Sequence, residues 1–182
     1  MKKILQRENK ILRRNAREVL VREIKTTKIK KILREMSSAL KSQNDGVAIA
    51  APQIGYPLRI FIVSGKIIKT GSAMQQGNEK VQTNAKDLIF INPKISKLSR
   101  EKEWLSEGCL SVRWLYGKTF RSKKAVITAY DKNGKKFERG ASGLLAQIFQ
   151  HETDHLNGIL FIDHAKDIKE ELPKNRTHES KT

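Results

Sequence analysis

The segment FQHETDHLNG, residues 149–158, constrains the fold more than any other part of the sequence. His151 and His155 are four residues apart, so on an α-helix they lie on one face. The pattern predicts a helix over residues 142–157. Gly158 follows it directly, where glycine is favoured because it readily adopts the left-handed conformation. The fold must therefore present two imidazoles side by side.

Apolar residues surround the two imidazoles on this predicted helix. Leu144 and Ile148 lie on the same face as His151, and a neighbouring stripe is formed by Leu145, Phe149 and Leu156. A helix that is apolar on two faces is buried. The histidines are thus either two core residues or ligands of a divalent metal ion. A metal ion would remove the desolvation cost of burying them without partners.

Two acids accompany the histidines. Glu152 is rotated from His151 by roughly 100° around the helix, so it cannot easily share an ion with both imidazoles. It can reach a water molecule there, which is the position of a general base, or it can be an exposed helix carboxylate. Asp154 could orient a histidine or an arginine beside the site, or could be an ordinary surface acid.

The third ligand of such an ion could come from either side of the helix. Downstream, zinc proteases with a His-Glu-x-x-His motif use a histidine or a glutamate, and His164, Glu170 and Glu171 are available. Upstream, the segment EGCLSV at 107–112 contains Cys109, the single cysteine of the chain. A thiolate and two imidazoles leave one position open for water. Cys109 could also be a small buried hydrophobe, as most free cysteines are.

The rest of the chain predicts an α+β domain. A helix is expected over residues 26–43, where apolar side chains follow a helical stripe opposite lysines. Strands are expected at 57–65 and 87–95, with a polar loop at 65–87, and a hairpin with an Asn-Gly turn at 124–140. Short strands and a few helices without regular βαβ alternation indicate the α+β class.

Composition limits location and partners. The 182 residues carry a formal net charge of +18, and residues 1–42 contain 14 lysines and arginines against 4 glutamates, a local net of +10. Such a surface either attracts polyanions, of which RNA is the obvious candidate, or is a solvated helix face. A single cysteine allows no internal disulfide, and no apolar run approaches the roughly 20 residues of a membrane span. We expect a cytoplasmic protein without membrane contact.

Three segments in this order resemble those of the peptide deformylases: GVAIAAPQIG at 46–55, EGCLS at 107–111 and QHETDH at 150–155. The similarity spans residues 1–165, because ILRRNA near the start and NGILFIDH near the end also fit. It implies one catalytic domain over these residues and a polar tail at 166–182. It also implies small antiparallel or mixed β-sheets packed around a central C-terminal metal-binding helix, with an N-terminal helix.

The resemblance also implies residue roles. In the proteins that the chain resembles, the cysteine of the second motif and both histidines of the third bind the metal ion. The glutamate between them is the acid–base catalyst, while the glutamine of the first motif and the N–H after the cysteine hold the formyl oxygen. In this sequence the metal ligands are Cys109, His151 and His155, the catalyst is Glu152, and the oxygen is held by Gln53 and the Leu110 N–H. Without the resemblance, Gln53 would be taken as a turn residue.

The activity implied is metal-dependent hydrolysis of the N-formyl group from N-formyl-methionine of newly synthesised polypeptides, with release of formate. The metal is expected to be Fe²⁺ in the cell, with Zn²⁺, Ni²⁺ or Co²⁺ able to replace it. Val47, Leu144 and Ile148 would receive the methionine side chain, unless they are simply core residues. The full set of expected substrate contacts is Gly46, Val47, Ala48, Glu107, Gly108, Leu144 and Ile148.

The expected partners are nascent formyl-methionyl chains and, through the basic residues 1–42, ribosomal RNA. The C-terminal segment 166–182 is a poorer candidate, because it holds 5 basic against 4 acidic residues. Two other functions stay open from the residues alone. One is a zinc peptidase with its third ligand after residue 155, and the other is a non-enzymatic module that docks on ribosomal RNA.

Two residues depart from the family pattern. Ala48 stands where a second glycine is usual, and its methyl group could narrow the approach of the substrate backbone. Arg113 stands where proline often follows the second motif. Neither replaces a metal ligand or the catalytic glutamate, so we expect activity to be retained.

Overall fold

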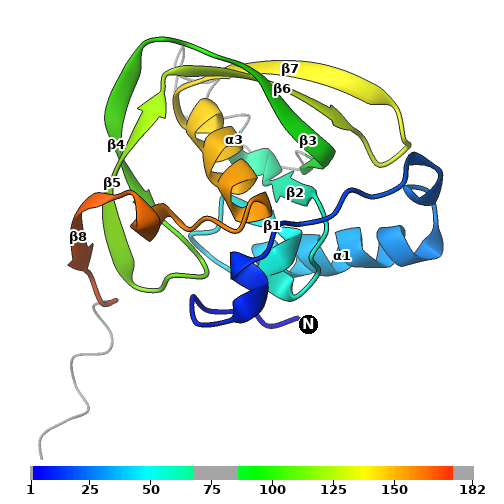
Figure 1. The fold of residues 1–182 in the computed structure, drawn as a ribbon. Helices are drawn as coiled ribbons and strands as arrows, with labels where there is room; N and C mark the ends of the chain where they lie inside the picture. The colour runs from blue at the N-terminus through cyan, green and yellow to red at the C-terminus, as the bar shows by residue number, and fades with distance from the viewer. Residues whose placement is uncertain (1, 68–85, 174–182) are drawn as a thin grey trace, which may run out of the picture.

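The computed structural model describes residues 2–67 and 86–173 (Figure 1). Its α-helices and 3-10 helices are α1 (Thr27–Lys41), α3 (Gly143–Leu156), η1 (Lys10–Arg13), η2 (Val21–Glu23), η3 (Ala51–Ile54) and η4 (Phe161–Asp163). Its strands are β1 (Ala48–Ala50), β2 (Ile60–Val63), β3 (Leu88–Leu98), β4 (Lys102–Gly108), β5 (Leu115–Ser122), β6 (Lys124–Tyr130), β7 (Lys136–Ser142) and β8 (Lys166–Glu170). Within these ranges no helix has the length and apolar character needed to cross a bilayer.

The strands form two sheets, each antiparallel throughout. One is five-stranded, in the order β1-β2-β3-β6-β7, and the other is three-stranded, in the order β4-β5-β8. The chain passes from one sheet to the other between β3 and β4, and returns between β5 and β6. Helix α3 lies between the sheets, which confirms the predicted α+β class and its central helix (Figure 1).

The apolar stripe predicted for residues 26–43 forms α1. Thr26 caps its start, because its hydroxyl oxygen accepts a hydrogen bond from the Ile29 N–H at 3.4 Å. The stripe is buried through Ile29, Ile32, Leu33, Met36 and Leu40. The strand predicted at 57–65 contains β2. The strand predicted at 87–95 covers most of β3, which continues to Leu98, and the predicted hairpin is β6 and β7.

Helix α3 is the helix predicted from the histidine pair. Ser142 is its N-cap residue, and Gly158 follows its end with φ 73°. Phe149 meets the ring of Phe90 edge-on with centroids 5.2 Å apart, and Phe90 stacks on Phe61 at 4.5 Å. This aromatic cluster attaches α3 to the five-stranded sheet and so fixes the direction in which its histidines point.

The basic N-terminal segment is bound to the core. Leu12 and Ala16 are buried, and the Ala16 N–H donates to the carbonyl of Leu156 at the end of α3, at 2.9 Å. The side chain of Asn92 in β3 accepts from the Val19 N–H at 2.8 Å and donates to the Val19 carbonyl at 2.7 Å. The segment therefore joins the central helix to the five-stranded sheet.

The three-stranded sheet is absent from the sequence-based expectations. The buried face of β4 and β5 is itself polar, since it carries Glu107, Thr119 and Arg121, so no apolar alternation marks these strands. Strand β8 lies in the segment expected as a polar tail, and all its side chains are exposed. The domain boundary at residue 165 stays a prediction. Of the loop expected at 65–87, residues 68–85 lie outside the described residues.

Gly158→Ala should destabilise the protein more than Gly134→Ala. Both glycines have positive φ angles, 73° and 77°, so either alanine introduces left-handed strain of about 1–2 kcal/mol. A Cβ at Gly158 would also lie 2.7 Å from the backbone carbon of Arg13, whereas at Gly134 it would meet no atom within 4 Å. Urea unfolding should therefore show the larger loss of unfolding free energy for Gly158→Ala. Equal losses would contradict the packing of the N-terminal segment against the end of α3.

Candidate metal centre

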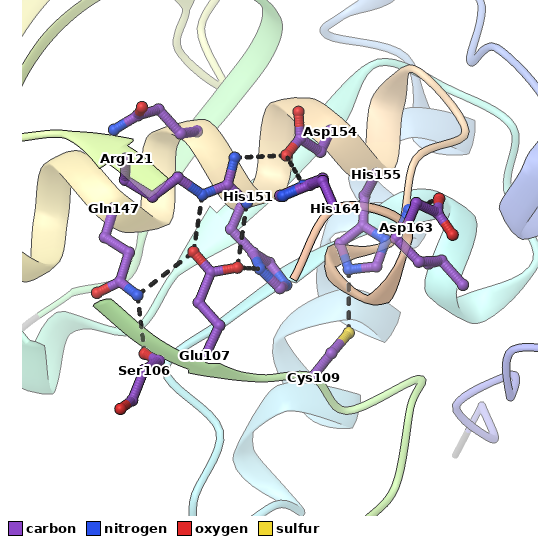
Figure 2. A network of polar contacts seen from close by, with 12 residues as sticks. Ser106, Glu107, Cys109, Arg121, Gln147, His151, Asp154, His155, Asp163 and His164 are labelled. Carbon is purple, nitrogen blue, oxygen red and sulfur yellow. Dashed lines mark hydrogen bonds and ion pairs between the residues drawn. The ribbon is translucent and has the colours of Figure 1, made fainter. Parts of the chain in front are cut away.

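Three metal-binding side chains from two distant segments meet in the structure. Cys109 follows β4, while His151 and His155 project from α3 (Figure 2). The sulfur of Cys109 lies 3.1 Å from Nε2 of His155, and one donor atom of each residue lies within 4.8 Å of the others. Bonds of ~2.0–2.3 Å to one ion place donor atoms roughly 3–4 Å apart, so this group fits a single metal ion.

The downstream candidates for the third ligand lie elsewhere. Nε2 of His164 is 3.5 Å from a carboxylate oxygen of Asp154, and His164 is not part of the group of donor atoms formed by Cys109, His151 and His155 (Figure 2). Glu170 is exposed in β8, and Glu171 is also exposed. The described part of the chain therefore lacks the arrangement of a zinc peptidase, which needs a ligand after residue 155.

The surroundings of Cys109 favour the thiolate. Burial opposes its ionisation, but the imidazoles of His155 and His151 outweigh this effect and lower the Cys109 pKa to about 5. Burial also opposes protonation of His151, but its contacts with Cys109 and Glu107 raise the His151 pKa well above the usual value. The thiol thus ionises readily beside two imidazoles. A divalent cation can take the place of the protons in such a cluster, and this donor set suits iron, cobalt, nickel and zinc.

A buried network of charged side chains contacts His151 through Glu107 (Figure 2). Oε2 of Glu107 is 3.0 Å from Nδ1 of His151, and the two carboxylate oxygens accept from Arg121 at 2.8 and 3.1 Å. Arg121 also donates to Asp154 at 2.6 Å, so Asp154 orients an arginine as anticipated. Burial disfavours the Glu107 carboxylate, but hydrogen bonds from His151 and Arg121 outweigh it and hold its pKa far below the usual range. The ionised carboxylate fixes the His151 ring and leaves Nε2 available to an ion.

The position of Glu107 differs from the expected substrate contact. Its oxygens are occupied by Arg121 and His151, and Gln147 donates to it at 3.3 Å. Glu107 therefore holds the His151 ring in position and does not face the cavity. Arg121 and Gln147 are missed by the sequence motifs. Recognition of β5 as a strand would have placed Arg121 on its buried face, where an unpaired charge is not tolerated.

Glu152 shares a cavity with Cys109. It is 4% exposed and lines the cavity beside Cys109, so the alternative of an exposed helix carboxylate is wrong. Burial raises the Glu152 pKa to about 7. Among the described residues, its Oε2 atom has no hydrogen-bond partner. A carboxyl group that titrates near neutrality, with one oxygen free, can both accept and return a proton.

Gln53 is fixed beside Cys109 and is no exposed turn residue. It is 2% exposed, and its carbonyl oxygen accepts from the Ala50 N–H at 2.8 Å. Its amide nitrogen donates to the hydroxyl of Ser111 at 3.1 Å and lies 3.6 Å from the Cys109 sulfur. Leu110 lines the cavity, and its N–H has no hydrogen-bond partner among the described residues. The Gln53 amide is therefore held at the cavity wall beside Cys109, and the Leu110 N–H stays available to another acceptor.

A cavity of about 260 Å³ opens beside Cys109 and Glu152. Of the expected substrate contacts, it is lined by Gly46, Val47, Ala48 and Gly108. Ile148 is packed into the core, and Leu144 is 51% exposed in the first turn of α3, so neither belongs to the described lining. The expectation that Leu144 is buried is wrong: the first turn of α3 packs on the sheet through Leu145, and Leu144 points away from that contact. The apolar wall comes instead from Val112, Trp114 and Leu115.

Arg113, which replaces the usual proline, closes one side of this cavity. Its guanidinium donates to both oxygens of Asp45, at 2.5 and 3.1 Å, and to Gln43 at 2.9 Å. It also lies 4.9 Å from the centre of the Trp114 ring. The chain before β1 is thus tied to the segment that follows Cys109 by an ion pair.

The sequence model of one family, described as polypeptide deformylase, matches residues 1–171. The chain belongs to the polypeptide deformylase family. Deformylases are metal-dependent hydrolases, and the activity of this chain is removal of the N-formyl group from nascent polypeptides. The match includes all three motifs around the cavity and the ligand group Cys109, His151 and His155.

Individual deformylases are similar in both sequence and structure. Peptide deformylase 2 of Clostridium acetobutylicum is 39% identical over 157 residues, covering 86% of this chain and 89% of that protein. The peptide deformylase of Borreliella burgdorferi is 41% identical over 130 residues, covering 71% and 69%. The crystal structure of the Thermotoga maritima peptide deformylase superposes with a TM-score of 0.75 at 31% identity, covering 91% of this chain and 98% of that one.

Glu107→Ala should weaken metal binding, because the His151 ring loses the group that orients it. Metal affinity, measured by competition with a chromophoric chelator, is expected to fall about 10–100-fold. Asp154→Asn is the matched control, since it removes the other acidic partner of Arg121 and leaves the Glu107–His151 contact in place. An equal loss in both variants would mean that charge balance around Arg121, and not ring orientation, sets the affinity.

Proposed function

We propose that Cys109, His151 and His155 bind the metal ion of this deformylase and that Glu152 is its acid–base catalyst. The observation that carries the proposal is the Cys109 sulfur, 3.1 Å from the His155 ring although 46 residues away along the chain. The proposed substrate is N-formyl-methionine at the start of a newly synthesised polypeptide. The products are formate and the free amino group.

The ion is proposed to be Fe²⁺ in the cell, with Zn²⁺, Ni²⁺ or Co²⁺ able to take its place. One thiolate and two imidazoles accept all four ions, so the cell's supply contributes to the choice. When bound, the ion supplies Lewis acidity and lowers the pKa of a water molecule beside Glu152.

Glu152 carries the protons of the reaction. As a carboxylate it accepts a proton from the attacking water, whose oxygen adds to the formyl carbon. It then donates this proton to the amine nitrogen as the carbon–nitrogen bond breaks and formate leaves. A pKa of about 7 in the buried side chain suits both steps, because neither form is strongly favoured near neutral pH.

Gln53 and Leu110 are proposed to hold the formyl oxygen. The Gln53 amide is fixed by Ser111 and Ala50, and the Leu110 N–H is free of other described partners. Both can donate to the negative charge that develops on this oxygen as water adds. One such donor is worth about 2.7–4 kcal/mol of transition-state stabilisation.

The cavity is proposed to receive the methionine end of the substrate. Val47 is 37% exposed at its edge, and Gly46 and Gly108 line it without side chains that would obstruct a peptide backbone. Ala48 also lines the cavity, so its methyl group takes space that the usual glycine leaves open.

Glu152→Ala should retain bound metal and lose deformylation. The ligand group stays intact, but no side chain transfers the protons, and the rate on formyl-Met-Ala-Ser should fall at least about 100-fold. Cys109→Ser is the counterpart, in which metal content after anaerobic purification should fall or change in identity. A Glu152→Ala variant that turns over at the wild-type rate would refute the assigned catalyst. Unchanged iron content and activity in Cys109→Ser would refute the thiolate ligand.

We further propose that the enzyme acts in the cytoplasm and that its catalytic domain spans residues 1–165. We also propose that it contacts ribosomal RNA through its basic N-terminal region. A hollow of about 730 Å³ lies between α1 and the β6–β7 turn. It is lined by the cations Lys30, Arg34, Lys41 and Lys132, and its described lining includes no carboxylate. Phosphate groups fit such a surface, and the substrate of the enzyme is made at the ribosome.

Lys30→Gln/Arg34→Gln should weaken co-sedimentation with ribosomes and make it less dependent on salt, because fewer counterions are released. Lys94→Gln/Lys136→Gln removes the same charge elsewhere and should leave ribosome binding unchanged. Deformylation of a short formyl-peptide should be the same in both variants. Ribosome binding that does not respond to salt or to the α1 substitutions would contradict the proposed contact.

A further inference from the structure

The three-stranded sheet has a second face that the metal centre does not use. Side chains alternate along β4 and β5, so Glu107 and Arg121 point inward to α3. The outward side chains are Lys102, Trp104 and Ser106 of β4 with Lys118 and Phe120 of β5. This sheet lies on the left of the molecule in Figure 1, on the other side of α3 from α1.

Two aromatic side chains lie together on this outer face. Trp104 and Phe120 are directly opposite each other across β4 and β5, with ring centroids 5.1 Å apart. They are 45% and 50% exposed, although aromatic side chains gain much from burial. Stability of the sheet alone does not require aromatics here, because β-branched side chains also support neighbouring strands.

Two lysines lie over the rings of the aromatic pair. Nζ of Lys166 lies 4.8 Å from the centre of the Trp104 ring, and Nζ of Lys102 lies 5.8 Å from the centre of the Phe120 ring. Lys118 stands on the same face, but its charge is offset by Asp167 at 3.8 Å. Aromatic rings between cations on an open sheet match the flat bases and the phosphates of a single-stranded nucleic acid.

We propose that the outer face of the β4–β5–β8 sheet binds single-stranded RNA. Bases take the place of the two ammonium groups over the Trp104 and Phe120 rings, and the long side chains of Lys102 and Lys166 turn to contact the phosphates. The net charge of +18 adds a long-range attraction to the same ligand. The surface is separate from the hollow at α1 and does not depend on the deformylase reaction.

Charge argues against other occupants of this face. A second copy of the chain, related by two-fold symmetry, would bring Lys102 and Lys166 against the same lysines of its partner. An apolar protein surface would cover these ammonium groups without supplying a counter-charge, which is costly. RNA provides both a stacking surface and negative charge.

The test measures binding of a fluorescein-labelled oligouridine of about eight nucleotides by fluorescence anisotropy. Trp104→Ala and Phe120→Ala should each weaken binding about tenfold without any change in charge, while Trp104→Phe should preserve most of it. Lys102→Gln/Lys166→Gln should weaken binding and flatten its salt dependence, whereas Lys94→Gln/Lys136→Gln should not. All variants should keep their activity on formyl-Met-Ala-Ser.

Unchanged binding by Trp104→Ala and Phe120→Ala, or an equal loss in Lys94→Gln/Lys136→Gln, would reduce the effect to general attraction and overturn the proposal. Analytical sedimentation of the same preparations measures whether this face instead binds a second copy of the chain. A dimer that dissociates on Trp104→Ala would assign the face to self-association and would also overturn it. Activity is measured separately, so failure of RNA binding is distinguishable from failure of the proposed catalytic roles.

Discussion

A buried helix that carries two imidazoles and a carboxylate needs charges from other elements to balance it. In this chain α3 contacts an apolar surface on one side, where Phe149 packs against Phe90 of the five-stranded sheet. On its other side the three-stranded sheet supplies Glu107 and Arg121. The polar sheet orients the His151 ring, and the cysteine that follows β4 completes the proposed ligand group. The five-stranded sheet thus stabilises α3 by burying its apolar side, and the three-stranded sheet supplies the charges that balance its polar side.

The helix and the common face of its two histidines could be predicted because they depend on local spacing, whereas the choice of Cys109 over the downstream candidates came from the family resemblance. The four-residue separation of His151 and His155 fixes their common face, and apolar neighbours indicate that the face is buried. The partner of Arg121 could not be predicted in this way. A polar residue on the buried face of a strand has no periodic pattern. The strand register aligns Arg121 with Glu103, but its partners are Glu107 and Asp154, which only the packing of both strands against α3 brings together.

The substrate walls show the same limit. Leu144 shares a helix face with His151, but it lies at the first turn of α3, where it remains 51% exposed. Helical periodicity gives a direction around the axis and does not show whether other elements cover every residue on that face. Arg113 is the converse case. It departs from the family pattern, yet its contacts with Asp45 and Gln43 connect the two segments beside the cavity.

The N-terminal segment contacts the end of α3 through the hydrogen bond from the Ala16 N–H to the Leu156 carbonyl and through Gly158, which packs against Arg13. These contacts affect when the enzyme can finish folding during its synthesis. The segment of residues 10–17 can complete its docking only after residues near 158 have left the ribosome, because the end of α3 forms part of its binding surface. Contacts of such large sequence separation slow folding. The centre of an enzyme that processes other new chains therefore cannot close until α3 and the residues directly after it have been synthesised.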